Sequence, residues 1–252
     1  MLNVHIPIEK EKLIVNELQN ALSEVIESGS QANPALSAVI HNYAKYHAVL
    51  VIFGGLLVIL FAWLSIRFWA NFKRNSMISN SKWSFEKKVY FSFGIISSFI
   101  TLLMALIVVA NATNTFYPLH GFSLFIDSFA ISDGESYKNE WRLAFMEWIR
   151  SGNENIPAMI QQKINARIEF HATKAIVCGV LFIIFVALGL FLWNSLIKRT
   201  KALGAKWRYI EKTYFLSGIA TVALSLLLMV MVVANTQGAI APLTAFLVGL
   251  SG

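Results

Sequence analysis

The chain has 252 residues, of which 56% are hydrophobic and only 14% are charged, and its formal net charge at pH 7 is +7. Soluble globular domains carry about 25% charged residues, so the composition excludes an ordinary soluble fold and indicates a membrane protein. The basic residues lie beside the apolar segments, where orientation in a bilayer explains them, so nucleic acid is not an expected partner. The single cysteine, Cys178, excludes an intramolecular disulfide and a cysteine-ligated metal site.

The first 46 residues predict an amphipathic helix outside the membrane. Ser28-Gly29 predicts its end, and Asn33-Pro34 predicts a second helix that runs into the first apolar segment. Ser151-Gly152 and Ile156-Pro157 repeat these two signals before the third apolar segment. Side chains on the apolar face follow helical spacing. They are Ile14, Leu18, Ala21, Leu22, Val25 and Ile26.

Four apolar runs predict transmembrane helices at residues 48–68, 89–110, 172–193 and 213–234. Each run is close to the ~20 residues that an α-helix needs to cross the hydrocarbon core of a bilayer. None contains aspartate or glutamate, which disfavours a proton-coupled transporter or an ion pump. We therefore expect an all-α integral membrane protein with four spans.

The two short loops between paired spans predict the orientation of the chain. Residues 69–88 contain five basic residues and one acidic residue, and residues 194–212 contain six and one. Basic short loops face the cytoplasm, so the N-terminus, the central loop and the C-terminus are expected outside it. We expect a multi-pass protein of the cell membrane, preferably the bacterial inner membrane. The tryptophans beside these loops are predicted interfacial anchors: Trp69, Trp83, Trp193 and Trp207.

An internal repeat covers nearly the whole chain. Residues 82–122 align without a gap to residues 206–246, and 16 of 41 positions are identical. We divide the chain into a first repeat at 1–122, an outer linker at 123–138 and a second repeat at 139–252. Each repeat has two spans, so both copies keep the same orientation, and a pseudo-twofold axis along the membrane normal is expected.

His47 and His171 occupy equivalent positions of the two repeats, at the outer ends of the first and third spans. Two imidazoles brought together by the axis would suit haem b or a small metal site. The alternative is that each histidine caps a carbonyl or faces lipid headgroups. We expect no cofactor, and haem b is kept as the hypothesis to test.

Polar positions within and beside the spans also recur in both copies. Hydroxyl pairs on the second and fourth spans predict either close helix packing or a pore lining. Asn111 and Asn235 predict helix C-terminal caps or an outer vestibule. A basic and aromatic collar predicts contact with anionic lipid headgroups or with a partner protein. The hydroxyl pairs are Ser97 with Thr101 and Thr221 with Ser225, and the collar comprises Lys82, Trp83, Lys88, Lys206, Trp207 and Lys212.

These features favour a non-enzymatic subunit of a larger secretion, transport or assembly complex, acting as a scaffold through its spans and outer helices. One alternative is a small channel or solute carrier with a weakly polar path between the second and fourth spans. The other is a b-haem electron-transfer subunit. The expected partners are the lipid bilayer and other membrane proteins, and a homo-oligomer is compatible with this interpretation.

Overall fold

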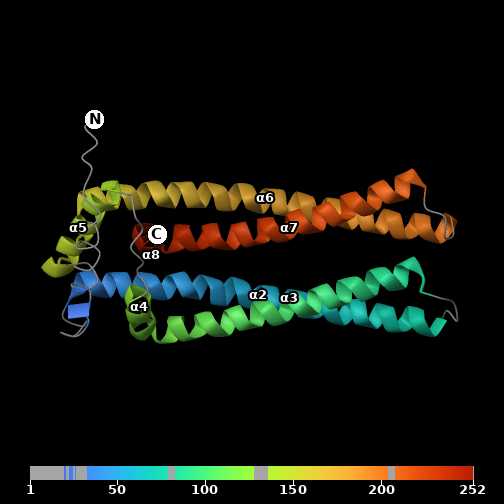
Figure 1. The fold of residues 1–252 in the computed structure, drawn as a ribbon, viewed down its shortest axis with the longest axis horizontal. Helices are drawn as coiled ribbons and strands as arrows, with labels where there is room; N and C mark the ends of the chain where they lie inside the picture. The colour runs from blue at the N-terminus through green and yellow to red at the C-terminus, as the bar shows by residue number, and fades with distance from the viewer. Residues whose placement is uncertain are drawn as a thin grey trace. The chain divides into compact units, whose positions relative to one another are not determined.

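The computed structural model describes residues 20, 23–24, 26, 33–78, 83–127, 136–203 and 208–251. Within these residues the chain is helical and contains no strand, which confirms the all-α prediction. The predicted N-terminal amphipathic helix lies almost entirely outside the described residues. The helices, labelled in Figure 1, are α2 (Pro34–Ile78), α3 (Phe85–Phe116), α4 (Pro118–Asp127), α5 (Ser136–Ser151), α6 (Ala158–Leu203), α7 (Tyr209–Ile240) and α8 (Pro242–Ser251).

Four of these helices, α2, α3, α6 and α7, are long and apolar enough to cross a membrane, as expected of a multi-pass membrane protein. α2 and α6 begin at residues 34 and 158, 14 residues before the predicted spans at 48 and 172. At ~1.5 Å per residue, the 45 residues of α2 are far longer than the ~30 Å hydrocarbon core. The predicted continuation of a Pro-initiated helix into the first span is therefore confirmed.

Local capping explains where the helices begin and end. The Asn33 side chain accepts a hydrogen bond from the Leu36 N–H at 2.9 Å, so it caps α2 with Pro34 in the first turn. Gly152 has φ +63°, and its N–H donates to the Ile149 carbonyl, which ends α5 as the sequence predicted. At α7, the Glu211 carboxylate accepts a hydrogen bond from the Arg208 N–H at 2.9 Å.

The chain forms two compact units, and each draws residues from both halves of the sequence. The end unit comprises Met1–Leu50, Ala110–Ala172 and Thr236–Gly252. The span unit comprises Val51–Val109 and Thr173–Asn235. The two compact units therefore do not coincide with the two sequence repeats.

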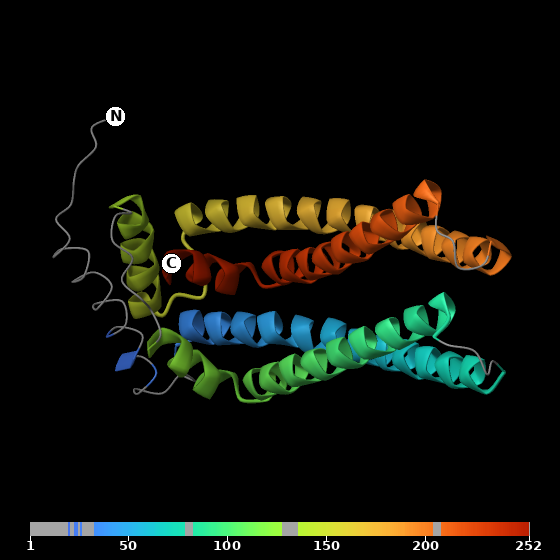
Figure 2. The ribbon, with the colours of Figure 1, turned by 45° about the vertical axis from the view of Figure 1, so that its right-hand side comes forward.

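The end unit has a dense apolar core formed by α4, α5, α8 and the first parts of α2 and α6. In Figure 2, α5 runs across the direction of α2 and α6. Trp148, Phe122 and Phe145 are the largest fully buried side chains. The other core residues are Ala35, Leu36, Val39, Tyr43, Ile126, Met146, Ile149, Ile160, Ile164, Leu243, Phe246, Leu247 and Leu250.

Polar contacts between distant parts of the sequence hold the end unit together. The Asn42 amide oxygen accepts a hydrogen bond from the Thr244 N–H at 3.0 Å. Gln237 Nε2 donates to the Tyr46 carbonyl at 3.0 Å. Asn33 Nδ2 donates to the Ile149 carbonyl at 2.8 Å. Such bonds satisfy polar groups that would otherwise be costly to bury.

In the span unit, α2 lies beside α3 and α6 beside α7 (Figures 1 and 2). Small residues let these helices approach closely. A Cβ atom built on Gly94 would lie 3.2 Å from the Trp69 indole, and one on Gly218 would lie 3.1 Å from the Trp193 indole. These two tryptophans therefore pack against the paired helix, whereas the sequence predicted interfacial anchors.

Candidate functional site: an apolar cavity in the span unit

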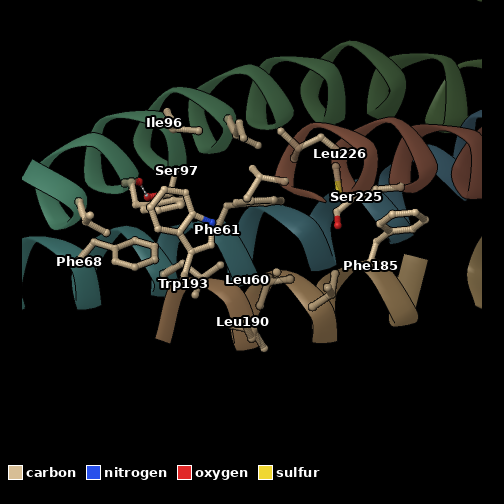
Figure 3. Close-up of a pocket in the computed structure, with 18 of the residues that line it drawn as sticks. Leu60, Phe61, Phe68, Ile96, Ser97, Phe185, Leu190, Trp193, Ser225 and Leu226 are labelled. Carbon is tan, nitrogen blue, oxygen red and sulfur yellow. Dashed lines mark hydrogen bonds between the residues drawn. The ribbon is translucent and has the colours of Figure 1, made fainter. Parts of the chain in front are cut away.

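A cavity of about 480 Å³ lies among all four long helices of the span unit. Figure 3 shows side chains from each helix around it. Leu60, Phe61 and Phe68 come from α2, Ile96 and Ser97 from α3, Phe185, Leu190 and Trp193 from α6, and Ser225 and Leu226 from α7. The lining is almost entirely apolar, and none of its residues is charged. Its volume is within the range of about 300–1,000 Å³ that is typical of small-molecule sites.

Trp193 forms one wall of this cavity. Its indole packs against Gly218 on α7, and its Nε1 donates a hydrogen bond to the Gly218 carbonyl at 3.2 Å. On its other sides it meets the ring of Phe93 at 5.0 Å and that of Phe215 at 5.9 Å. Because glycine has no side chain, α7 can accept the indole against its backbone, and the ring is fixed in place.

A groove of about 640 Å³ between α3 and α7 adjoins the cavity. Lys88 is the one charged residue among its lining residues. Phe85 and Phe215 lie at the same groove with their ring centroids 6.5 Å apart. The groove therefore combines an apolar wall with a basic group near the N-terminus of α3.

No family model, curated protein or solved structure matches this chain. Its function is therefore inferred from the exposure of its long helices and from the packing within each unit.

The four repeated hydroxyl residues turn toward their own helices. Ser97 donates to the Phe93 carbonyl at 2.6 Å and Thr101 to the Ser97 carbonyl at 2.8 Å. Thr221 donates to the Gly218 carbonyl at 2.9 Å and Ser225 to the Thr221 carbonyl at 2.8 Å. Ser97 and Ser225 line the cavity, but Thr101 and Thr221 are not among its lining residues. This geometry favours helix packing, and the pore lining stays a prediction.

The repeated histidines lie in the end unit, each against the second long helix of its own half. His47 Nδ1 donates to the Asn111 amide oxygen at 2.6 Å. The His171 ring lies against Gly238, where an added Cβ would be 2.6 Å away. In the described part of the chain, no three His, Cys, Asp or Glu residues are grouped to hold a metal ion. The haem hypothesis therefore stays a prediction.

Asn111 and Asn235 do not cap helix C-termini, so this interpretation was wrong. α3 continues to Phe116 and α7 to Ile240, five residues past each asparagine. Inside a helix, an asparagine side-chain amide forms hydrogen bonds with a neighbouring helix or with the backbone carbonyl one turn earlier. Asn111 accordingly binds His47, and Asn235 Nδ2 donates to the Met231 carbonyl at 2.7 Å.

The collar is described only in part, because Lys82, Lys206 and Trp207 lie outside the described residues. Trp83 is exposed, and its ring meets Phe91 at 5.3 Å. Lys88 lines the groove, and Lys212 is exposed on α7. Among the described collar residues, Lys88 therefore lies at the groove.

A polar contact within the span unit was missed by the sequence analysis. The Ser65 hydroxyl on α2 lies 2.6 Å from that of Ser98 on α3, and Trp69 Nε1 donates to Ser98 at 3.2 Å. Since Ser98 donates to the Gly94 carbonyl, Ser65 is the donor to Ser98. The aligned positions of the second repeat are glycine and valine, so a search for repeated polar residues passes over this pair.

Substituting alanine at Gly238 is expected to destabilise the protein by about 1–2 kcal/mol, because the new methyl group collides with the His171 ring. Gly55→Ala is the matched control, since a Cβ there meets no atom within 4 Å. Alanine favours a helix over glycine by about 1 kcal/mol, so the control should be neutral or stabilising. Thermal unfolding in detergent measures both variants, and midpoint shifts of the same sign would contradict the expected collision.

Proposed function

We propose that this protein is a non-enzymatic scaffold subunit of a larger membrane complex serving secretion, transport or assembly. The observation that carries the proposal is the low internal burial of the long helices. Only 11% of the most apolar 18-residue stretch of α2, α3 and α6 is buried within the chain, and 22% of that of α7. A core-facing helix of a self-sufficient bundle presents about three residues in seven to its core. Most of each helix is therefore left for lipid and for other subunits.

The outward face of α2 supports a role in assembly. Large apolar residues there recur at alternating intervals of four and three, and each is between 55% and 69% exposed. This 3.5-residue period is typical of the seam between two helices in left-handed packing. The residues are Ile52, Leu56, Ile59, Trp63 and Ile66. Exposed Ile176, Val180, Ile183 and Leu190 follow the same register on α6.

The end unit supports the scaffold role in a different way. Its core joins helices from both halves of the chain, and its polar contacts connect residues up to 202 positions apart. A closely packed unit of this kind holds its shape because its side chains interdigitate. It offers a rigid surface to partners outside the bilayer.

We also infer a tandem arrangement of two same-orientation two-span repeats. The support is a constant offset of 124 residues between the starts of α2 and α6, α3 and α7, and α4 and α8. α3 and α7 each contain 32 residues, and α4 and α8 each contain 10. The packing of Trp69 on Gly94 recurs as that of Trp193 on Gly218 at the same offset.

The proposed orientation places both basic loops in the cytoplasm and the end unit outside it, in a bacterial inner membrane. The grouping of the N-terminal, central and C-terminal segments into one compact unit supports one part of this proposal, that all three lie on one side of the membrane. All three of these segments must lie on the same side of the membrane if the chain crosses it four times.

Cysteine labelling tests this orientation in a Cys178→Ser background. His120→Cys, on α4, is expected to react with a membrane-impermeant maleimide on intact cells. Arg74→Cys, at the end of α2 near the first basic loop, is expected to react only after permeabilisation. Both native residues are exposed, so accessibility within the fold does not differ. The reverse labelling pattern would show the opposite orientation.

The scaffold role is tested by native mass spectrometry of the protein purified from its own membranes in a mild detergent. We expect additional polypeptides in fixed stoichiometry. A photo-crosslinking residue at Trp63, on the exposed face of α2, should capture one of them. The adjacent Leu64 lines the cavity of the span unit and serves as the control. A lone chain with no polypeptide crosslink from Trp63 would refute the scaffold proposal.

A further inference from the structure

We infer that the cavity and groove of the span unit form a site for one phospholipid with an anionic headgroup. An acyl chain occupies the apolar volume, and the phosphate lies at the basic end beside Lys88. This inference concerns a ligand of the single chain and does not depend on the proposed role in a complex.

The cavity and the groove form one continuous apolar space. They share six lining residues, which are Val89, Phe93, Ile96, Trp193, Val222 and Leu226. The cavity wall offers no charged side chain, and the hydroxyls of Ser97 and Ser225 are bonded to their own helices. Tyr90 and Asn194 also line the cavity, but apolar surface dominates its wall, so the space favours hydrocarbon.

The site opens sideways from the span unit. Leu60, Ile96 and Leu190 line the cavity and are 45%, 44% and 62% exposed. For helices that cross a bilayer, an apolar opening at this level meets lipid chains. An empty space would forfeit the dispersion contacts of its wall, so a chain entering from the bilayer has a favourable place to bind.

Charge at one end of the groove identifies the headgroup. Lys88 lines the groove one turn from Ser92 and less than one turn from Phe85. Lys212 is exposed on the face of α7 that carries Phe215 and Ile219, three and seven residues further on. α3 begins at Phe85 and α7 at Tyr209, close to these lysines, and each first turn also holds a carboxylate, Glu86 or Glu211. Glu211 is paired with Arg199, and neither carboxylate lines the groove, so Lys88 sets the charge of the lining. An anionic phosphate complements this end.

The geometry favours lipid over a helix from another subunit. The rings of Phe85 and Phe215 meet edge to face at the groove, with their centroids 6.5 Å apart. This contact joins α3 to α7 there, so an α-helix about 10–12 Å wide cannot pass between the two helices at this level. A thin, flexible acyl chain can instead follow the apolar lining beside this ring contact, with its phosphate near Lys88.

Native mass spectrometry of the delipidated full chain in detergent tests the site. Titration with palmitoyl-oleoyl phosphatidylglycerol is expected to give one bound lipid per chain. Phosphatidylcholine with the same acyl chains is expected to bind at least about five-fold more weakly. Lys88→Gln should weaken phosphatidylglycerol binding by about five-fold. Arg74→Gln removes a charge outside the groove lining and should leave binding unchanged.

Filling the apolar space tests the acyl-chain part of the site. Val222 lines both the cavity and the groove, and Val222→Trp should reduce lipid binding at least about ten-fold. Leu224→Trp places the same side chain on an exposed position of α7 outside both linings and is the control. Ser225→Leu is a milder filling variant for use if Val222→Trp does not fold, as judged by circular dichroism.

Three results would overturn the inference. One is that phosphatidylglycerol and phosphatidylcholine bind with equal affinity, and that Lys88→Gln changes neither affinity. Another is full retention of phosphatidylglycerol in folded variants whose cavity is filled. The third is that the groove holds a second copy of the chain or another polypeptide. In that case Val222→Trp would change the mass of the assembly but not the number of bound lipids.

Discussion

Replacing Trp148 with alanine is expected to destabilise the end unit by about 4 kcal/mol. The Trp148 side chain is 2% exposed in the centre of the core. Its ring meets that of Phe145 at 5.6 Å, and its Nε1 donates to the Asn153 carbonyl at 2.8 Å. Alanine removes the ring, leaves a cavity and leaves the carbonyl without this donor. Denaturant unfolding in detergent, followed by near-ultraviolet circular dichroism, measures the loss.

Two further variants separate packing from hydrogen bonding at this position. Trp148→Phe keeps an aromatic ring but loses the N–H donor, so an intermediate loss of about 2 kcal/mol is expected. Leu143→Ala, on the exposed face of the same helix, should change stability by less than about 1 kcal/mol. If Trp148→Ala were no more destabilising than Leu143→Ala, the end unit would not have the described core.

Arg142→Met is expected to cost about 3 kcal/mol and to loosen α8. The Arg142 side chain is 3% exposed, and its Nε and one terminal nitrogen donate to the Leu250 carbonyl at 3.1 and 2.6 Å. A cation at this place also interacts favourably with the negative end of the α8 dipole. Methionine keeps much of the volume but removes the charge and both donors. Hydrogen exchange should show reduced protection of α8 amides.

Arg150→Met provides the matched control for this prediction. Arg150 lies on the same helix but is exposed, so removal of its charge should leave α8 protected. Arg142→Lys keeps the charge but not the forked geometry and should fall between the two. Unchanged exchange of α8 in Arg142→Met would mean that this contact does not hold the helix.

Much of the helical framework could be predicted from the sequence because it depends on local signals. Uninterrupted apolar length predicts the long helices, and Pro34 and Gly152 mark boundaries through their own backbone preferences. Periodicity does not report which helices meet. The bond between Asn42 and Thr244 joins residues 202 positions apart, and no local pattern predicts it.

The candidate site was predictable only in fragments. The recurrence of hydroxyl residues in both repeats points to Ser97 and Ser225, and both line the cavity. The cavity itself depends on side chains whose packing no spacing rule describes. Trp193 is an aromatic residue at the end of a predicted span, as an interfacial anchor would be. Because Gly218 has no side chain, however, the Trp193 ring packs against it inside the span unit. Whether an aromatic residue faces lipid or a neighbouring helix is decided by the small residue opposite it.

The core of the end unit has a consequence for the order of biosynthesis. It joins residues from α2, near the beginning of the chain, with Leu243, Phe246, Leu247 and Leu250 of α8. A ribosome supplies α8 only after the four long helices have been translated, so the nascent chain must carry the apolar faces of α2, α4 and α5 uncovered until then. An interrupted or slowly inserted chain would leave that surface open to chaperones and proteases. Completion of the core thus marks a chain in which all four long helices and α8 have been made.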